Sequence, residues 1–167
     1  GTTNFGEDVF LNPWGFMVDL YRLTQERRIV PEFEVFELGH LHSLARLVDT
    51  CGLPFGGRVH VDFVLGVPGS LPATPQALLA GVAMLPAVAT SWSATGIGRG
   101  HLPVAATAVA AGGHLRVGME DNLVLAKGRP VTHNVELVSR AVELATLLQR
   151  PPLTTTEARE LLAIARR

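Results

Sequence analysis

The sequence has one cysteine, few charges and no long apolar run. Cys51 alone cannot form an internal disulfide, which is typical of a reducing compartment, so we expect a cytoplasmic protein. No stretch approaches the roughly 20 apolar residues of a membrane span, and the N-terminus has no basic segment followed by an apolar one. The 14 basic and 15 acidic residues nearly balance, which excludes a general electrostatic attraction to nucleic acid or to an anionic membrane.

What the chain does contain is a large apolar fraction. Of its 167 residues, 47% are hydrophobic and only 17% are charged. A chain of this length and composition can bury a substantial core. We therefore expect residues 1–167 to form a single domain.

Apolar periodicity divides the chain into alternating strands and helices. Helices are expected over residues 13–28, 39–52, 75–85, 102–111 and 134–148, with a last short helix capped by Thr155 or Thr156. Strands are expected over residues 29–38, 59–65, 87–92 and 113–122, and residues 1–5 resemble the end of another strand. A glycine-rich loop is expected over residues 93–100.

This alternation indicates a parallel α/β fold with right-handed crossovers. Two architectures remain open at this point: a small doubly wound sheet, or the C-terminal part of a (β/α)8 barrel. Four or five strands cannot close an eight-stranded barrel, which takes about 250 residues. An incomplete barrel would leave strand edges for another chain to cover.

The stretch over residues 113–122 joins a short apolar strand to a cluster of charges. If it is extended, Arg116 and Glu120 share one face and apolar side chains take the other. Asp121 and Asn122 follow directly. Such charges are costly to bury unless they are paired, bound to metal or used in chemistry. The stretch is therefore either a buried ion-pair network or a site in which one carboxylate binds a cation and the other acts as a base.

Other candidate groups lie where the expected strands end, which is where functional residues gather in parallel α/β folds. Gly96 and Gly98 precede a helix and Arg99 is adjacent, so we expect these three residues to bind the phosphates of a cofactor. His40 and His42 have a spacing that suits a metal pair on a strand, but residues two apart on a helix do not face each other. We interpret His40 as a helix-start residue and His42 as solvated.

Four segments carry a resemblance to a known family. They are residues 113–122 (GHLRVGMEDN), 32–39 (EFEVFELG), 96–99 (GIGR) and 157–159 (EAR). Taken in their order along the chain, from residue 32 to residue 159, they strongly resemble the β-keto acid cleavage enzyme family, and the Arg-Val-Gly-x-Glu-Asp-Asn block is the specific part.

The resemblance implies a zinc-dependent transferase built as a (β/α)8 barrel, usually a homotetramer. Such an enzyme condenses a β-keto acid with acetyl-CoA and gives acetoacetate and a new CoA thioester. By matching motif, Glu120 would bind zinc, Asp121 would be the general base, Arg116 its charged partner, and Glu34 the acidic residue linked to that arginine.

The resemblance also implies that this chain supplies about the last four to five βα units of the barrel. The family's histidine metal ligands belong to its second strand and a further acidic ligand to its first, and neither strand is in the sequence. We therefore expect association with an N-terminal portion. Two alternatives stand beside this function: another metal-dependent barrel lyase or aldolase that works without CoA, and a non-catalytic barrel fragment or subunit.

Overall fold

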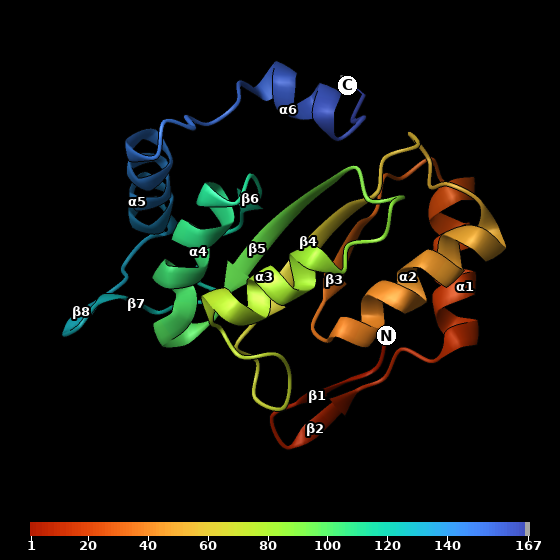
Figure 1. The fold of residues 1–167 in the computed structure, drawn as a ribbon, viewed down its shortest axis with the longest axis horizontal. Coiled ribbons are helices and arrows are strands. Elements are labelled where there is room, and N and C mark those ends of the chain that lie inside the picture. The colour runs from red at the N-terminus through yellow and green to blue at the C-terminus, as the bar shows by residue number, and fades with distance from the viewer. Residues whose placement is uncertain (166–167) are drawn as a thin grey trace.

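The computed structural model describes residues 1–165. Its centre is a four-stranded parallel sheet in the order β3-β4-β5-β6 (Figure 1). The strands are β3 (Glu32–Val35), β4 (His60–Leu65), β5 (Ser91–Gly96) and β6 (His114–Leu115). The predicted parallel α/β fold is confirmed, and it is consistent with a barrel of the TIM type.

Within residues 1–165, six α-helices accompany the sheet. They are α1 (Trp14–Glu26), α2 (Leu38–Cys51), α3 (Pro75–Ala83), α4 (His101–Ala110), α5 (Asn134–Leu147) and α6 (Thr155–Leu161). Helices α2, α3 and α4 connect successive strands and lie on one face of the sheet (Figure 1). None of the helices in the described part of the chain is long and apolar enough to cross a membrane.

The helix-covered face holds the main apolar core. Alternation along β4 directs Val61, Phe63 and Leu65 toward the helices, where none of the three is exposed. They pack with a set of buried side chains from the helices: Leu41, Leu44, Val48, Leu78, Val104 and Ala108. All six residues of β4 are buried, as its nearly continuous apolar sequence predicts.

Two short antiparallel hairpins complete the fold. The first pairs β1 (Thr3–Phe5) with β2 (Asp8–Phe10), and the second pairs β7 (Val124–Ala126) with β8 (Arg129–Pro130). The first hairpin is anchored to the loop after β4, since the amide of Gly6 donates to the carbonyl of Pro68 at 3.0 Å. The predicted strand end at residues 1–5 is therefore one arm of a hairpin.

Three predicted boundaries are wrong. The third parallel strand lies at Ser91–Gly96 and not at residues 87–92, because residues 86–89 form a turn that ends with Ala89 donating to Pro86. The strand predicted over residues 113–122 stops at Leu115. The last helix is capped by Thr154, whose hydroxyl accepts from Glu157 while the Glu157 carboxylate accepts from the amide of Thr154.

Candidate active site

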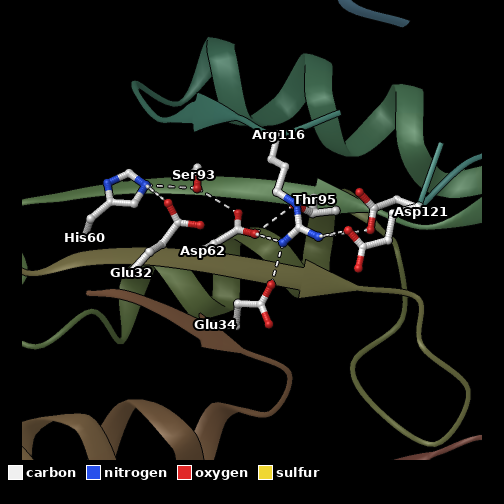
Figure 2. A network of polar contacts seen from close by, with 9 residues as sticks. Glu32, Glu34, His60, Asp62, Ser93, Thr95, Arg116 and Asp121 are labelled. Carbon is white, nitrogen blue, oxygen red and sulfur yellow. Dashed lines mark hydrogen bonds and ion pairs between the residues drawn. The ribbon is translucent and has the colours of Figure 1, made fainter. Parts of the chain in front are cut away.

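The second face of the sheet is polar, although the same strands build it. Strand register places Glu34 beside Asp62 and Asp62 beside Ser93. Alternation puts these side chains on the face that α2, α3 and α4 do not cover. Figure 2 shows Glu34 and Asp62 pointing toward Arg116, which follows β6, while Ser93 points toward Asp62.

Arg116 is the centre of a cluster of four carboxylates. Its Nη1 donates to Glu34 at 2.5 Å and to Asp62 at 3.4 Å. Its Nη2 lies 3.4 Å from Asp121 and 3.5 Å from Glu120. The carboxylates of the cluster differ in exposure. The side chains of Asp62 and Asp121 are 0% and 6% exposed, whereas that of Glu120 is 84% exposed. One cation thus links groups that lie far apart in the sequence.

The two acidic residues that follow Arg116, Glu120 and Asp121, lie in a tight turn and not in an extended strand. The amides of Asp121 and Asn122 both donate to the carbonyl of Gly118, at 3.1 and 3.0 Å. Asn122 fixes the turn to the end of β5 by donating to the carbonyl of Gly96 at 2.9 Å, and Asn134 accepts from the amide of Met119. The alternation argument for residues 113–122 is therefore wrong beyond Leu115.

A pocket of about 680 Å³ opens beside this cluster. Glu34, Arg116, Glu120 and Asp121 line its charged side. The rest of the lining is mainly apolar and comes from the first hairpin, from one residue of β4 and from the segments that follow the strands: Phe5, Asp8, Val9, Phe10, Phe36, Val64, Val67, Pro68 and Ile97. A small organic acid with one polar and one apolar end has the right size and character for such a pocket.

The environment of Asp121 opposes its ionisation. Burial raises the pKa of its carboxyl above the ordinary value of 3.8, Arg116 acts against that rise, and the negative charges of Glu120, Asp62 and Glu34 add to it. For Arg116, burial alone would lower the pKa, but the hydrogen bond to Glu34 and the surrounding carboxylates outweigh it and raise the pKa. Asp121 is thus a base with a nearly buried side chain, and its proton affinity is set by that burial, by one guanidinium and by the neighbouring carboxylates.

The polar face extends beyond the predicted residues. His60 contacts Ser91 through Nδ1 at 2.7 Å and Ser93 through Nε2 at 3.1 Å, and Glu32 lies 3.8 Å from its Nε2. Sequence reasoning missed Asp62 and His60 as site residues. A signal was present, since both stand at alternate positions of an otherwise apolar strand, which marks a second and polar face.

The other predicted binding residues lie outside the pocket lining. Gly96 ends β5, and an added Cβ would come within 2.7 Å of the backbone of His101, so the close packing of β5 against α4 requires glycine there. Gly98 opens a short 3₁₀ turn with φ +64°, and Arg99 in that turn is exposed. Their binding of cofactor phosphate stays a prediction.

The histidine pair is separated in the way we predicted. His40 is 8% exposed, and its Nδ1 accepts from the amide of Phe36 at 3.2 Å. Its Nε2 consequently donates to the carbonyl of Thr2 at 3.2 Å. His42 lies two residues further along α2 and is exposed. The two rings do not form a metal pair.

The donor set for a metal ion is incomplete in the part of the chain that the structure describes. Within residues 1–165, no group of three or more His, Cys, Asp or Glu side chains is arranged to hold a metal ion. The cluster nevertheless carries four carboxylates against one guanidinium, and Glu120 directs an exposed carboxylate toward solvent at the pocket. These residues fit one side of a cation site and need further ligands to complete it.

The fold and the cluster together define a parallel α/β protein with a carboxylate–arginine site at the carboxyl ends of its strands. The sequence model of the β-keto acid cleavage enzyme matches residues 1–164. The chain belongs to the β-keto acid cleavage enzyme family.

Individual relatives agree with this assignment. The chain is 36% identical over 167 residues to the 3-keto-5-aminohexanoate cleavage enzyme of Acetoanaerobium sticklandii, covering 99% of the chain and 60% of the relative. It is 37% identical over 165 residues to the enzyme of the same name from Fusobacterium nucleatum, covering 98% and 59%. It is 31% identical over 166 residues to the 3-oxoadipate:acetyl-CoA acetyltransferase of Cupriavidus necator, covering 98% and 58%. The chain thus spans about three-fifths of the length of these relatives.

Proposed function

We propose that the chain is part of an enzyme that transfers the acyl group of a β-keto acid to coenzyme A. The reaction joins the keto acid to the acetyl group of acetyl-CoA and releases acetoacetate and a new acyl-CoA. The names of the relatives support both substrates, since two are named 3-keto-5-aminohexanoate cleavage enzymes and a third is named a 3-oxoadipate:acetyl-CoA acetyltransferase. The observation that carries the proposal is the pairing of Asp121 with Arg116 in an open pocket.

In this proposal Asp121 is the general base. It takes a proton from the carbon between the two carbonyl groups of the keto acid, and that carbon then attacks the thioester of acetyl-CoA. The released thiolate attacks the original keto carbonyl, the bond between that carbon and the deprotonated carbon breaks, and Asp121 returns its proton to the resulting enolate to give acetoacetate. Such proton transfer by a positioned carboxylate contributes typically about 10²–10⁴-fold to a rate.

Arg116 and Glu34 support this base. Arg116 lies 3.4 Å from Asp121, so its charge favours the ionised carboxylate that the first step requires. Glu34 receives a hydrogen bond from the other amino group of Arg116 and limits the directions in which the guanidinium can turn. The apolar side of the pocket, which includes Phe10, Phe36 and Ile97, offers a surface for the apolar end of the keto acid.

We propose that Glu120 supplies one ligand to a zinc ion, and that the remaining ligands come from outside the described residues. Zinc bound there would act as a Lewis acid on the substrate carbonyl. The exposed carboxylate of Glu120 and the excess of negative charge around Arg116 support this role. We also propose that Gly96, Gly98 and Arg99 contact the phosphates of acetyl-CoA.

The sheet supports a larger assembly. Within the described residues, β3 and β6 each pair with a single neighbouring strand, and the connecting helices cover only one face. We propose that β3 to β6 are consecutive units of a (β/α)8 barrel, that an N-terminal portion supplies the others, and that the complete cytoplasmic enzyme is a homotetramer. Light scattering of the whole enzyme tests the assembly.

The experiment for the reaction is an assay of the whole enzyme with a panel of β-keto acids, with and without acetyl-CoA. We expect acetoacetate and a new acyl-CoA in equal amounts, only when acetyl-CoA is present. Cleavage without acetyl-CoA would favour a lyase or aldolase. No turnover on any keto acid, together with no bound zinc by elemental analysis, would favour a non-catalytic subunit.

A further inference from the structure

Asp62 is a charged residue in the most buried strand of the sheet. It is 0% exposed, and the other five residues of β4 are buried as well. Removing a carboxylate from water is expensive unless hydrogen bonds and an opposite charge replace the lost hydration. The surroundings of Asp62 therefore have to satisfy both of its oxygens.

Both oxygens are in fact occupied. Ser93 donates to Oδ1 at 2.7 Å, and Thr95 donates to Oδ2 at 2.8 Å. The same Oδ2 lies 3.4 Å from Nη1 of Arg116. Figure 2 shows the carboxylate held between the two hydroxyls of β5 and the guanidinium. Asp62 is thus fixed in orientation by two short hydrogen bonds from a neighbouring strand.

The direction of the hydrogen bonds follows from the chemistry of the groups. An ionised carboxylate can only accept hydrogen bonds, so Ser93 donates its one hydroxyl proton to Asp62. His60 Nε2, 3.1 Å from the same hydroxyl, must then be the donor, which leaves Nδ1 to accept from Ser91. The chain of donors from Ser91 through His60 and Ser93 therefore ends on Asp62.

Among the four carboxylates around Arg116, Asp62 has the least freedom. Glu34 and Glu120 have side chains that are 43% and 84% exposed, and Asp121 comes from a turn. Asp62 and Glu34 both contact Nη1, which leaves Nη2 directed at Asp121. Because the guanidinium is planar, fixing Nη1 also fixes where Nη2 lies.

We propose that Asp62, oriented by Ser93 and Thr95, is a positioning residue that holds Arg116 in register with Asp121. This role rests on the proposed function, in which Asp121 is the base and Arg116 its partner. Asp62 does not line the pocket, so it acts through Arg116 and not on the substrate. Asp62 therefore affects the rate through the position of Arg116 relative to Asp121. A displacement of about 1 Å in such a catalytic group can lower the rate by about 10²-fold.

The first test is the variant Asp62→Asn in the whole enzyme. We expect kcat to fall by about 10- to 100-fold while KM changes by less than about threefold, because substrate contacts are retained. The matched control is Asp49→Asn, which makes the same change from carboxylate to amide at an exposed position of α2, a helix on the opposite, apolar face of the sheet. This control is expected to keep kcat within about twofold.

A second pair of variants keeps the test decisive if Asp62→Asn does not fold. Thr95→Val preserves the shape but removes the hydroxyl that donates to Oδ2, and Thr95→Ser restores a hydroxyl. We expect Thr95→Val to lower kcat and Thr95→Ser to recover most of it. Equal activity of the valine and serine variants would overturn the proposal.

A measurement that does not depend on turnover tests the role of Asp62 independently of the proposed reaction. Nuclear magnetic resonance of the Arg116 guanidinium reports whether rotation about its C–N bonds is slow. We expect slow rotation in the parent enzyme and in Asp49→Asn, and faster rotation in Asp62→Asn and Thr95→Val. If the parent enzyme transfers no acyl group, the proposed function fails while this measurement still decides the role of Asp62. Unchanged rotation in Asp62→Asn and Thr95→Val would overturn that role.

Discussion

The two faces of the β3–β6 sheet are built by the same strands and differ in almost every physical respect. On one face Phe63 and its apolar neighbours pack against three helices and none of their contacts depends on charge. On the other face Asp62, one position earlier in β4, is equally buried but is held by hydroxyls and a guanidinium. Burial therefore does not distinguish core from site in this protein; the kind of partner does.

Because their partners differ, the apolar face contributes mainly to the stability of the fold and the polar face mainly to the arrangement of the site. The apolar face gains free energy from removing surface from water, roughly in proportion to its area. The polar face gains little net stability from its ion pairs, because desolvation offsets them, yet it fixes the direction of each group. We expect variants on the first face to lower stability and variants on the second to lower turnover.

The largest effect is expected on the polar face. Asp121→Asn in the whole enzyme removes the proposed base, and we expect kcat to fall by about 10²- to 10⁴-fold. Because burial raises the pKa of Asp121, its ionised form at neutral pH opposes folding, so the variant should not melt at a lower temperature. Steady-state kinetics and calorimetry measure the two effects, with exposed Glu143→Gln as the control. Unchanged kcat would remove Asp121 as the base.

The next effect is expected on the apolar face. Phe63→Ala leaves a cavity among side chains that are fully buried, and we expect a loss of about 3–5 kcal/mol in the free energy of unfolding. Urea denaturation measures it. Phe55→Ala is the control, because Phe55 is 39% exposed, and should cost less than about 1 kcal/mol. Equal losses for the two phenylalanines would break the distinction between the faces.

A smaller effect is expected where α3 crosses the same core. A Cβ added at Gly81 would lie 2.6 Å from the ring of Phe63, so Gly81→Ala should cost about 1–3 kcal/mol through overpacking. Gly15 in α1 is the matched control, since nothing lies within 4 Å of the corresponding position there. Gly15→Ala should be neutral or stabilising by up to about 1 kcal/mol in the same denaturation measurement. A neutral Gly81→Ala would show that the ring of Phe63 moves freely.

The smallest effect concerns a carboxylate on neither face. Hydrogen bonds from the amide and hydroxyl of Thr132 and the amide of His133 lower the pKa of Glu136 from 4.5 to about 2 at the start of α5. A lowered pKa means that this contribution to stability is complete above pH 4.5 and is lost as the pH falls toward 2. Glu136→Gln should therefore unfold at lower urea than the parent at pH 7, with a gap that closes on acidification. A gap independent of pH would contradict this assignment.

The sequence alone determined the alternation of strands and helices and the family. Both signals are local: apolar periodicity marks each helix, and the block from Arg116 to Asn122 is contiguous. The predicted Arg116, Glu120, Asp121 and Glu34 do lie together in the structure. The local pattern did not predict where the strand after Gly113 ends. A turn fixed by Gly118 and Asn122 replaces the extended chain that the alternation of side chains assumes.

Only the tertiary structure decided the partners of the site residues. Arg116 meets Glu34 across 82 positions and Asp62 across 54, and Asp62 meets Ser93 across 31. In the sequence Asp62 stands with His60 at alternate positions of an otherwise apolar strand, and this local pattern does not show which groups compensate its charge. A buried charge is tolerated only where other groups replace its hydration, and here those groups come from other strands, which the pairing of the strands in the folded sheet brings beside Asp62.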